Sequence, residues 1–328
     1  MTEDSPDVLV PDSPGDPALL VPIPDATLHR LSGETMGTRW VVQVALRHPS
    51  VLGAIQATIE AALAQVIAQM SQWKADSQLT RFNRLGAGEA MTIASGFAHV
   101  LDCALTIAAT SDGAFDPALG KVTEAWGFGV ADAPSHRPGP VARACDWRAI
   151  ALDRAARRVT QPGGLALDLS GIAKGFAVDL ISLRLAHTGY GHHLVEIGGE
   201  LRASGVKPDG QPWWVDVERA PGSKGSVQRV SLTGWSIATS GDWLRRRGEA
   251  GGGWSHTLSP DAGAPIVSGP RAASVLHRGC MQADALATVM MVMGETAGID
   301  FADRHGVAAH VTDADGRAHS SAAWRAML

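Results

Sequence analysis

The chain has 328 residues, of which 45% are hydrophobic and 19% are charged, and its formal net charge is −5. This is the composition of a globular protein with a substantial core, which excludes disordered and fibrous classes. The acidic balance argues against a broad basic surface for nucleic acid or an anionic membrane. No run of about 18 uninterrupted apolar residues predicts a transmembrane helix.

Residues 1–25 are acidic and rich in proline. We expect them to form a flexible N-terminal arm, with one domain over residues 26–328. The arm has neither the basic start nor the apolar stretch of a secretory signal. We therefore expect either a cytoplasmic protein or one whose leader has been removed, and favour the first. The three cysteines, Cys103, Cys145 and Cys280, are odd in number and lack metal-ligand spacing, so free thiols are expected.

The first half of the chain alternates predicted strands, helices and glycine-rich turns. In chain order these are a strand over 38–46, a helix over 51–70, a helix over 95–110, a turn over 111–120, a loop over 130–147, a short buried strand over 165–169 and a helix over 170–189.

The second half reads as strand segments separated by Gly and Pro turns. These segments lie within 192–205, 213–220, 227–241 and 272–279, and are followed by a helix from Cys280 and a closing strand within 307–316. The mixture predicts an α+β fold. Because no clean linker divides the chain, we expect two intermixed subdomains with the functional site between them.

The segment "LDLSGIAKGFAVD" places Asp168 at the end of the predicted strand, with Ser170 and Gly171 where a helix would begin. Free backbone N–H groups at a helix start bind phosphate, glycine permits close approach, and Lys174 can add a positive charge. The alternative is structural: Asp168 or Ser170 only caps the helix and Lys174 is solvated.

The segment "ADALAT" places Asp284 and Thr288 four residues apart on an apolar helix, so both can face one point. Burying a lone carboxylate is costly unless it is paired or bound to a metal. A carboxylate, a hydroxyl and a nearby carbonyl are hard oxygen ligands that suit Mg²⁺. The alternative is an acid near the helix start, with Thr288 bonding back to its own helix.

Other segments carry weaker signals. Phe115 and Asp116 lie on a turn, where a packed ring and an Asx-turn are the structural alternative. The two glycines of "EIGGE" at 196–200 indicate a bulge or a close ligand contact. His256 is the natural proton-transfer candidate, although a lone histidine is more often structural. Trp73 could stack on a flat ring or simply pack in the core.

In this order the motifs resemble the FAD:protein FMN transferase family of the ApbE type. The resemblance extends from "GETMGTRW" at 33–40 to the last predicted strand. It includes "MSQWKADSQLTRFN", "GAFDPALGKVTEAWGFG", "LDLSGIAKGFAVD", "LVEIGGELRASG", "IATSGDW", "HTLSPDAGAPI" and "CMQADALATVMMVMG". Many ordered blocks together are far more specific than one glycine-rich loop.

The resemblance implies a Mg²⁺-dependent enzyme that cleaves FAD, transfers FMN to a Thr or Ser hydroxyl of a target flavoprotein and releases AMP. The FAD contacts it implies are Met36, Trp73, Ala114, Phe115, Asp116, Asp168, Lys174 and Leu258. The metal ligands it implies are Asp284 and Thr288, with backbone oxygens near Gly171 and Ala287. The acceptor hydroxyl also needs a base, for which Asp284 and His256 remain alternatives.

The chain departs from the family pattern at two positions. Trp73 stands where the family commonly has Tyr, and Ser259 where it usually has Asp, so altered affinity is expected rather than lost activity. The family's acceptor pattern, an Asp-Gly stretch leading to Ser/Gly-Ala-Thr, is absent from this sequence. We therefore expect the flavin to be attached to another protein.

Two other functions compete with this one. The same site using water in place of a protein hydroxyl would be a Mg²⁺-dependent FAD pyrophosphatase that yields FMN and AMP. A protein without catalysis could bind or deliver a flavin. The combination of "DLSGIAKG" and "ADALAT" argues against the second alternative, because a binder needs no metal-centred charge clamp.

Overall fold

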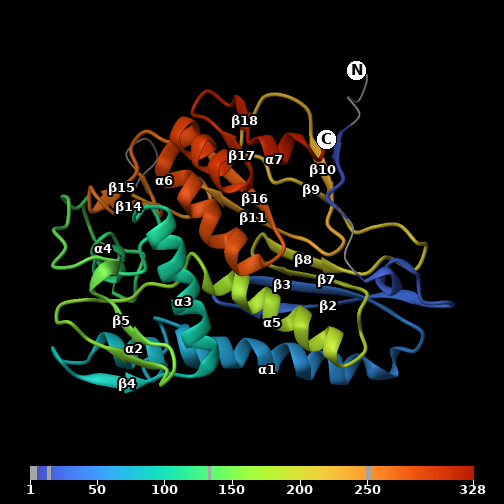
Figure 1. Cartoon of the computed structure of the whole chain (residues 1–328), viewed down its shortest axis with the longest axis horizontal. Helices are drawn as coiled ribbons and strands as arrows, with labels where there is room; N and C mark the ends of the chain where they lie inside the picture. Colours follow the sequence, from blue (N-terminus) through green and yellow to red (C-terminus); the bar gives the residue numbers. More distant parts are fainter. Residues whose placement is uncertain (1–5, 13–15, 132–133, 249–252) are drawn as a thin grey trace.

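The computed structural model describes residues 6–12, 16–131, 134–248 and 253–328 (Figure 1). Its centre is an eight-stranded antiparallel sheet in the order β18-β17-β16-β11-β8-β7-β3-β2. The strands are β2 (Thr27–Thr35), β3 (Thr38–Leu46), β7 (His193–Ile197), β8 (Glu200–Ser204), β11 (Ser236–Gly241), β16 (Ala272–His277), β17 (Ala308–Thr312) and β18 (Ala318–Ser320). Strands from both ends of the chain therefore share one sheet.

Shorter strands form small sheets around this centre. They are β1 (Asp7–Leu9), β10 (Gln228–Ser231) and β9 (Trp214–Asp216); β4 (Ala90–Thr92), β6 (Arg158–Thr160) and β5 (Ala151–Asp153); β12 (Arg246–Arg247) with β13 (Trp254–Ser255); and β14 (Leu258–Ser259) with β15 (Ala264–Pro265).

Helices pack beside the large sheet and beside each other (Figure 1). They are α1 (Leu52–Met70), α2 (Gln78–Asn83), α3 (Ser95–Thr110), α4 (Gly120–Ala125), α5 (Ala173–His187), α6 (Cys280–His305) and α7 (Ala322–Arg325), with 3₁₀ turns η1 (Pro17–Leu20), η2 (Pro49–Val51) and η3 (Trp147–Ala149). By length and hydropathy α1 and α6 could cross a membrane. In this fold both contribute buried side chains to the main hydrophobic cluster.

The hydrophobic pattern explains these elements. In α1 the buried residues Ile55, Ile59, Leu63, Val66 and Met70 recur every three or four positions, which gives the helix one apolar side. The same cluster joins side chains between residues 40 and 311, so distant parts of the chain share one core. Elements α2, α4, β4 and β5 gather at one end of the molecule in Figure 1. The α+β class is confirmed, with its parts intermixed along the chain.

Most predicted elements are confirmed: β3, α1, α3 and α6 lie where the sequence places them, and α5 begins three residues later than expected, at Ala173. The loop over 130–147 is confirmed where the structure describes it, and residues 132–133 lie outside the described part. The three cysteines are free thiols, as expected.

One expectation is wrong. Residues 165–169 form no strand, because their backbone groups bond elsewhere: Leu167 N–H donates to Asn83, and Asp168 N–H donates to the carbonyl of Pro117. Within the N-terminal segment, β1 pairs in parallel with β10 and Leu9 is fully buried. Residues 1–5 and 13–15 of the expected arm lie outside the described residues.

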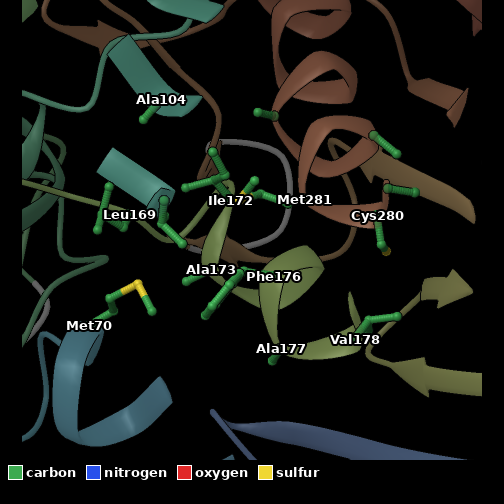
Figure 2. Close-up of a cluster of buried hydrophobic side chains, with 14 of the residues drawn as sticks. Met70, Ala104, Leu169, Ile172, Ala173, Phe176, Ala177, Val178, Cys280 and Met281 are labelled. Atoms are coloured by element: carbon green, nitrogen blue, oxygen red, sulfur yellow. The ribbon is translucent and has the colours of Figure 1, made fainter. Parts of the chain in front are cut away.

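The start of α6 crosses the start of α5 at very short range. A Cβ on Gly175 would lie only 2.3 Å from the carbonyl oxygen of Cys280, so no larger residue fits at 175. Asp179 on α5 accepts hydrogen bonds from the N–H groups of Cys280 and Met281, at 3.0 and 2.9 Å. A side-chain carboxylate at the first N–H groups of a helix stabilises that end. Figure 2 shows α5 and the start of α6 within one buried cluster.

This crossing predicts that Gly175→Ala lowers the free energy of unfolding by about 1–3 kcal/mol or more, because the added methyl group overpacks the helix contact. Gly53→Ala in α1 is the matched control, since a Cβ there meets nothing within 4 Å. It should leave stability within about 1 kcal/mol of wild type or raise it. Urea unfolding measures both. Wild-type stability of Gly175→Ala would contradict the proposed tightness of the crossing.

Candidate functional site

A cavity of about 630 Å³ opens where α5, α6, β8 and the segment after β11 meet. This volume is in the range of small-molecule sites, roughly 300–1,000 Å³. Of the residues singled out by sequence, those lining it are Trp73, Ala114, Phe115, Asp116, Asp168, Ser170, Gly171, Lys174, Gly198, His256, Leu258, Asp284 and Thr288. An adjoining, more apolar groove of about 500 Å³ is lined by Met36 and shares Trp73, Asp168 and Lys174 with the cavity.

The turn before α5 is built by Asp168. One carboxylate oxygen accepts the N–H of Ser170 at 2.8 Å and also its hydroxyl, and the other accepts the hydroxyl of Thr123 at 2.6 Å. Asp168 therefore shapes the turn five residues before the helix rather than capping its first residue. Ser170, Gly171 and Lys174 all line the cavity, so this turn presents backbone and one cation to it.

Asp284 and Thr288 lie on α6 at the same wall of the cavity. The Asp284 side chain is only 4% exposed, and one of its carboxylate oxygens accepts the N–H of Gly175 at 3.0 Å. Thr288 Oγ1 lies 3.5 Å from the Asp284 carbonyl oxygen and 3.1 Å from the position of a Cβ on Gly171. Burial raises the pKa of the Asp284 carboxyl, against the opposing effects of Lys174 and the Gly175 N–H.

These groups form a corner of hard oxygen donors. Asp284 supplies a carboxylate and Thr288 a hydroxyl, beside the glycine backbone at 171. Among the described residues no three His, Cys, Asp or Glu side chains gather as a metal cluster. The donor set fits a Mg²⁺ ion that keeps waters and takes phosphate oxygens as further ligands. Ala287 is fully buried on α6 and lines neither cavity.

Lys174 is paired with Glu200, a residue that the sequence analysis did not single out. Glu200 is the first residue of β8, is 2% exposed and forms a salt bridge with Lys174 through Oε1. Its second oxygen, Oε2, is buried without a hydrogen-bond partner among the described residues. Burial by itself would lower the pKa of Lys174, but attraction to Glu200 and Asp284 raises it, so the side chain is an ammonium.

His256 lies between β13 and β14, and its ring is fixed by Arg245. Its Nδ1 is 3.2 Å from the Arg245 carbonyl oxygen, which also accepts the His256 backbone N–H at 3.2 Å. Because a carbonyl only accepts, Nδ1 carries the proton and Nε2 keeps its lone pair. Burial lowers the pKa of His256 to about 4, so the ring is neutral near pH 7. Phe128 packs edge-on against it, with centroids 6.2 Å apart.

Aromatic and apolar side chains complete the lining. Trp73 is 51% exposed where the two cavities adjoin, so it is not a core residue and its ring remains available for stacking. Phe115 and Leu258 are buried in the cavity wall. Asp116 is already engaged: it accepts the N–H of Ala118 at 2.7 Å in an Asx-turn and forms a salt bridge with Arg143.

Sequence reasoning missed two parts of the site. Glu200 was overlooked because "EIGGE" drew attention to its glycines, which have φ values of 61° and 100° and form the turn before β8. The run Arg245, Arg246 and Arg247 also lines the cavity. Three consecutive arginines in a chain of negative net charge were a signal that could have identified an anion-binding edge.

Comparisons with known proteins point to one family. The ApbE family model matches residues 36–311. The chain is 34% identical to an FAD:protein FMN transferase of Vibrio cholerae over 284 residues, covering 83% of this chain and 84% of that protein. It is 34% identical to an FAD:protein FMN transferase of Haemophilus influenzae over 295 residues, covering 86% and 85%.

Solved structures show the same fold. The apo form of the flavinyl transferase ApbE of Pseudomonas stutzeri has a TM-score of 0.83 and 32% identity, covering 92% of this chain and 97% of that chain. The flavin transferase ApbE of Vibrio cholerae has a TM-score of 0.82 and 30% identity, covering 92% and 100%. With the match at residues 36–311 and relatives of this identity over most of their length, the chain belongs to the ApbE family.

Proposed function

We propose that this chain is an FAD:protein FMN transferase, which cleaves FAD and attaches FMN to a Thr or Ser hydroxyl of another protein. The observation that carries the proposal is one cavity that joins the Asp168 turn and Lys174 to the buried Asp284–Thr288 corner. Its curated relatives bear the same activity in their names. A protein that only binds flavin would not need an acidic corner beside an ammonium group.

FAD is the substrate in this proposal, and the cavity and its adjoining groove would hold it. The residues proposed to contact it are Met36, Trp73, Ala114, Phe115, Asp116, Asp168, Lys174 and Leu258, all of which line one or both hollows. Trp73 would stack on a flat ring system through its exposed face. Lys174 would place its charge next to the pyrophosphate.

Asp284 and Thr288 would hold a Mg²⁺ ion together with backbone oxygens near Gly171 and Ala287. When bound, the ion would neutralise negative charge that develops on the pyrophosphate. The chain's own contribution is to keep Asp284 oriented through the Gly175 N–H and shielded from bulk water. A carboxylate engaged by a cation is a weak proton acceptor, which leaves another group to act as base.

His256 is that base in our proposal. Its Nε2 would take the proton of the acceptor hydroxyl as the hydroxyl oxygen bonds to the FMN phosphorus. The bond between this phosphorus and the bridging oxygen breaks, and AMP leaves with that oxygen. The proton on Nε2 then passes to solvent or to AMP, which restores the neutral ring. Arg245, through its carbonyl, holds the ring in the tautomer that this step requires.

The acceptor belongs to another protein in this proposal. The family's acceptor pattern, an Asp-Gly stretch leading to Ser/Gly-Ala-Thr, does not occur in the sequence. Incubating the enzyme with FAD, Mg²⁺ and a fragment carrying that pattern should place FMN on the fragment and none on the enzyme, as read by intact mass. Release of FMN and AMP without a mass gain on the fragment would favour the pyrophosphatase instead.

Replacing His256 by Ala should lower kcat by roughly 10²–10⁴-fold, the usual contribution of a positioned general base. FAD binding, followed by quenching of flavin fluorescence, should change by less than about threefold, because the imidazole acts on the acceptor rather than on FAD. His29→Ala, at a position on β2 outside both cavities, is the control for loss of a histidine. Full activity of His256→Ala would exclude it as the base.

The pH profile provides an independent check. A base with a pKa of about 4 stays deprotonated at higher pH, so its activity is lost only as pH falls through that value. At saturating Mg²⁺, kcat/KM should be flat on the acid side from pH 8 to about pH 5 and fall below it. A fall in activity centred near pH 6.5 that disappears in His256→Ala would show a histidine with an ordinary pKa and contradict the lowered pKa of His256.

A further inference from the structure

Three ionisable side chains share the inner wall of the cavity. Lys174 pairs with Glu200, and the charge of Asp284 acts on both of them. Glu200 and Asp284 are 2% and 4% exposed, so bulk water screens their charges little. Burial raises the pKa of Glu200 to about 8, while Lys174 and a nearby cation both favour its ionised form. With both carboxylates ionised beside one ammonium, the cluster carries one negative charge in excess. That excess charge attracts a cation.

Glu200 is built into the cluster rigidly. It follows the Gly198–Gly199 turn, where both residues have positive φ, and it begins β8 in the middle of the large sheet. One carboxylate oxygen engages Lys174, while Oε2 is buried with no hydrogen-bond partner in the described part of the chain. Leaving a buried carboxylate oxygen unpaired is unfavourable. This indicates that the charge of Glu200 has a function.

The charge of Glu200 decides where Lys174 directs its ammonium. Without Glu200, the carboxylate left to attract Lys174 within the cluster is Asp284. An ammonium paired with Asp284 would compete with a divalent cation for the same oxygens and would repel that cation as well. Glu200 thus keeps the ammonium of Lys174 away from a divalent cation bound at Asp284, although both occupy the same cavity.

We infer that Glu200 is a positioning residue for the metal site: by pairing with Lys174, it keeps Asp284 available to a divalent cation. The inference rests on the proposed role of Asp284 as metal ligand. It concerns metal affinity and not the transfer step, so binding of the metal alone can test it.

The experiment is a titration of the FAD-free protein with Mn²⁺, in which electron paramagnetic resonance reports the free aquo ion. Wild type should bind Mn²⁺, and Asp284→Asn should lose this binding. Glu200→Gln preserves the shape of the side chain but removes its charge, and should raise the Kd for Mn²⁺ at least tenfold. Adding Lys174→Met to Glu200→Gln should return the Kd to within about threefold of wild type, because the competing ammonium is gone.

Two further variants make the test specific. Glu60→Gln removes an exposed acid on α1 that lines neither the cavity nor the groove. Its Kd should stay at the wild-type value. Lys174→Met alone leaves Glu200 and Asp284 without their ammonium and should tighten Mn²⁺ binding. This single variant keeps the test decisive if Glu200→Gln does not fold, as judged by circular dichroism.

The possible outcomes distinguish failure of the proposed metal site at Asp284 from failure of the proposed role of Glu200. If Mn²⁺ does not bind, or binds equally to Asp284→Asn, the proposed metal site itself is wrong. If Asp284→Asn abolishes binding but Glu200→Gln binds like wild type, the metal site stands and the role of Glu200 is wrong. A double variant as weak as Glu200→Gln, or weaker binding by Lys174→Met, would also overturn the inference, because Glu200 would then not act through Lys174.

Discussion

The close crossing of α5 and α6 is the constraint on which the site depends. With no side chain at Gly175, the Cys280 carbonyl approaches the α5 backbone, and this brings the Gly175 N–H within 3.0 Å of the Asp284 carboxylate. Asp179, one turn further along α5, caps the first N–H groups of α6. The same short segment therefore packs α6, orients its buried acid and presents Lys174 to the cavity.

Electrostatics follow from this packing. Burial raises the pKa of both Glu200 and Asp284 at the cavity wall, and the charge of Lys174 offsets only part of that penalty. The remaining negative charge is compatible with a bound cation, and the neighbouring hydroxyl of Thr288 adds an oxygen donor. His256 takes no part in this cluster: burial keeps its ring neutral, and the Arg245 carbonyl fixes which nitrogen carries the proton. The site thus separates groups suited to binding a cation from one suited to moving a proton.

Much of the fold could be predicted, because the spacing of apolar residues along the sequence shows which face of an element is buried. Alternation over 38–46 and three- to four-residue spacing over 51–70 each gave the correct element. Residues 165–169 gave the wrong one, since an apolar run does not reveal that its backbone bonds to Asn83 and Pro117. Likewise, only the partner strand β10 explains why Leu9 is buried within an acidic, proline-rich segment.

The parts of the site that could be predicted are those whose functional residues lie close together in the sequence. Asp284 and Thr288 share a helix face by spacing alone, and the Asp168 turn lies directly before α5. Glu200 was not predictable in this way, because its partner Lys174 is 26 positions earlier and only the fold brings the two together. The tautomer of His256 depends on a carbonyl contributed by another segment, which no sequence pattern encodes.

The buried Asp284 corner supports transfer of FMN to a protein hydroxyl in our proposal. The most direct measurement is intact mass of an acceptor fragment after incubation with FAD and Mg²⁺, with wild type and Asp284→Ala in parallel. We predict a mass gain of one FMN on the fragment with wild type, and loss of that gain with Asp284→Ala. Intact FAD and an unmodified fragment with the wild-type protein, beside a relative that is active in the same assay, would contradict the claim.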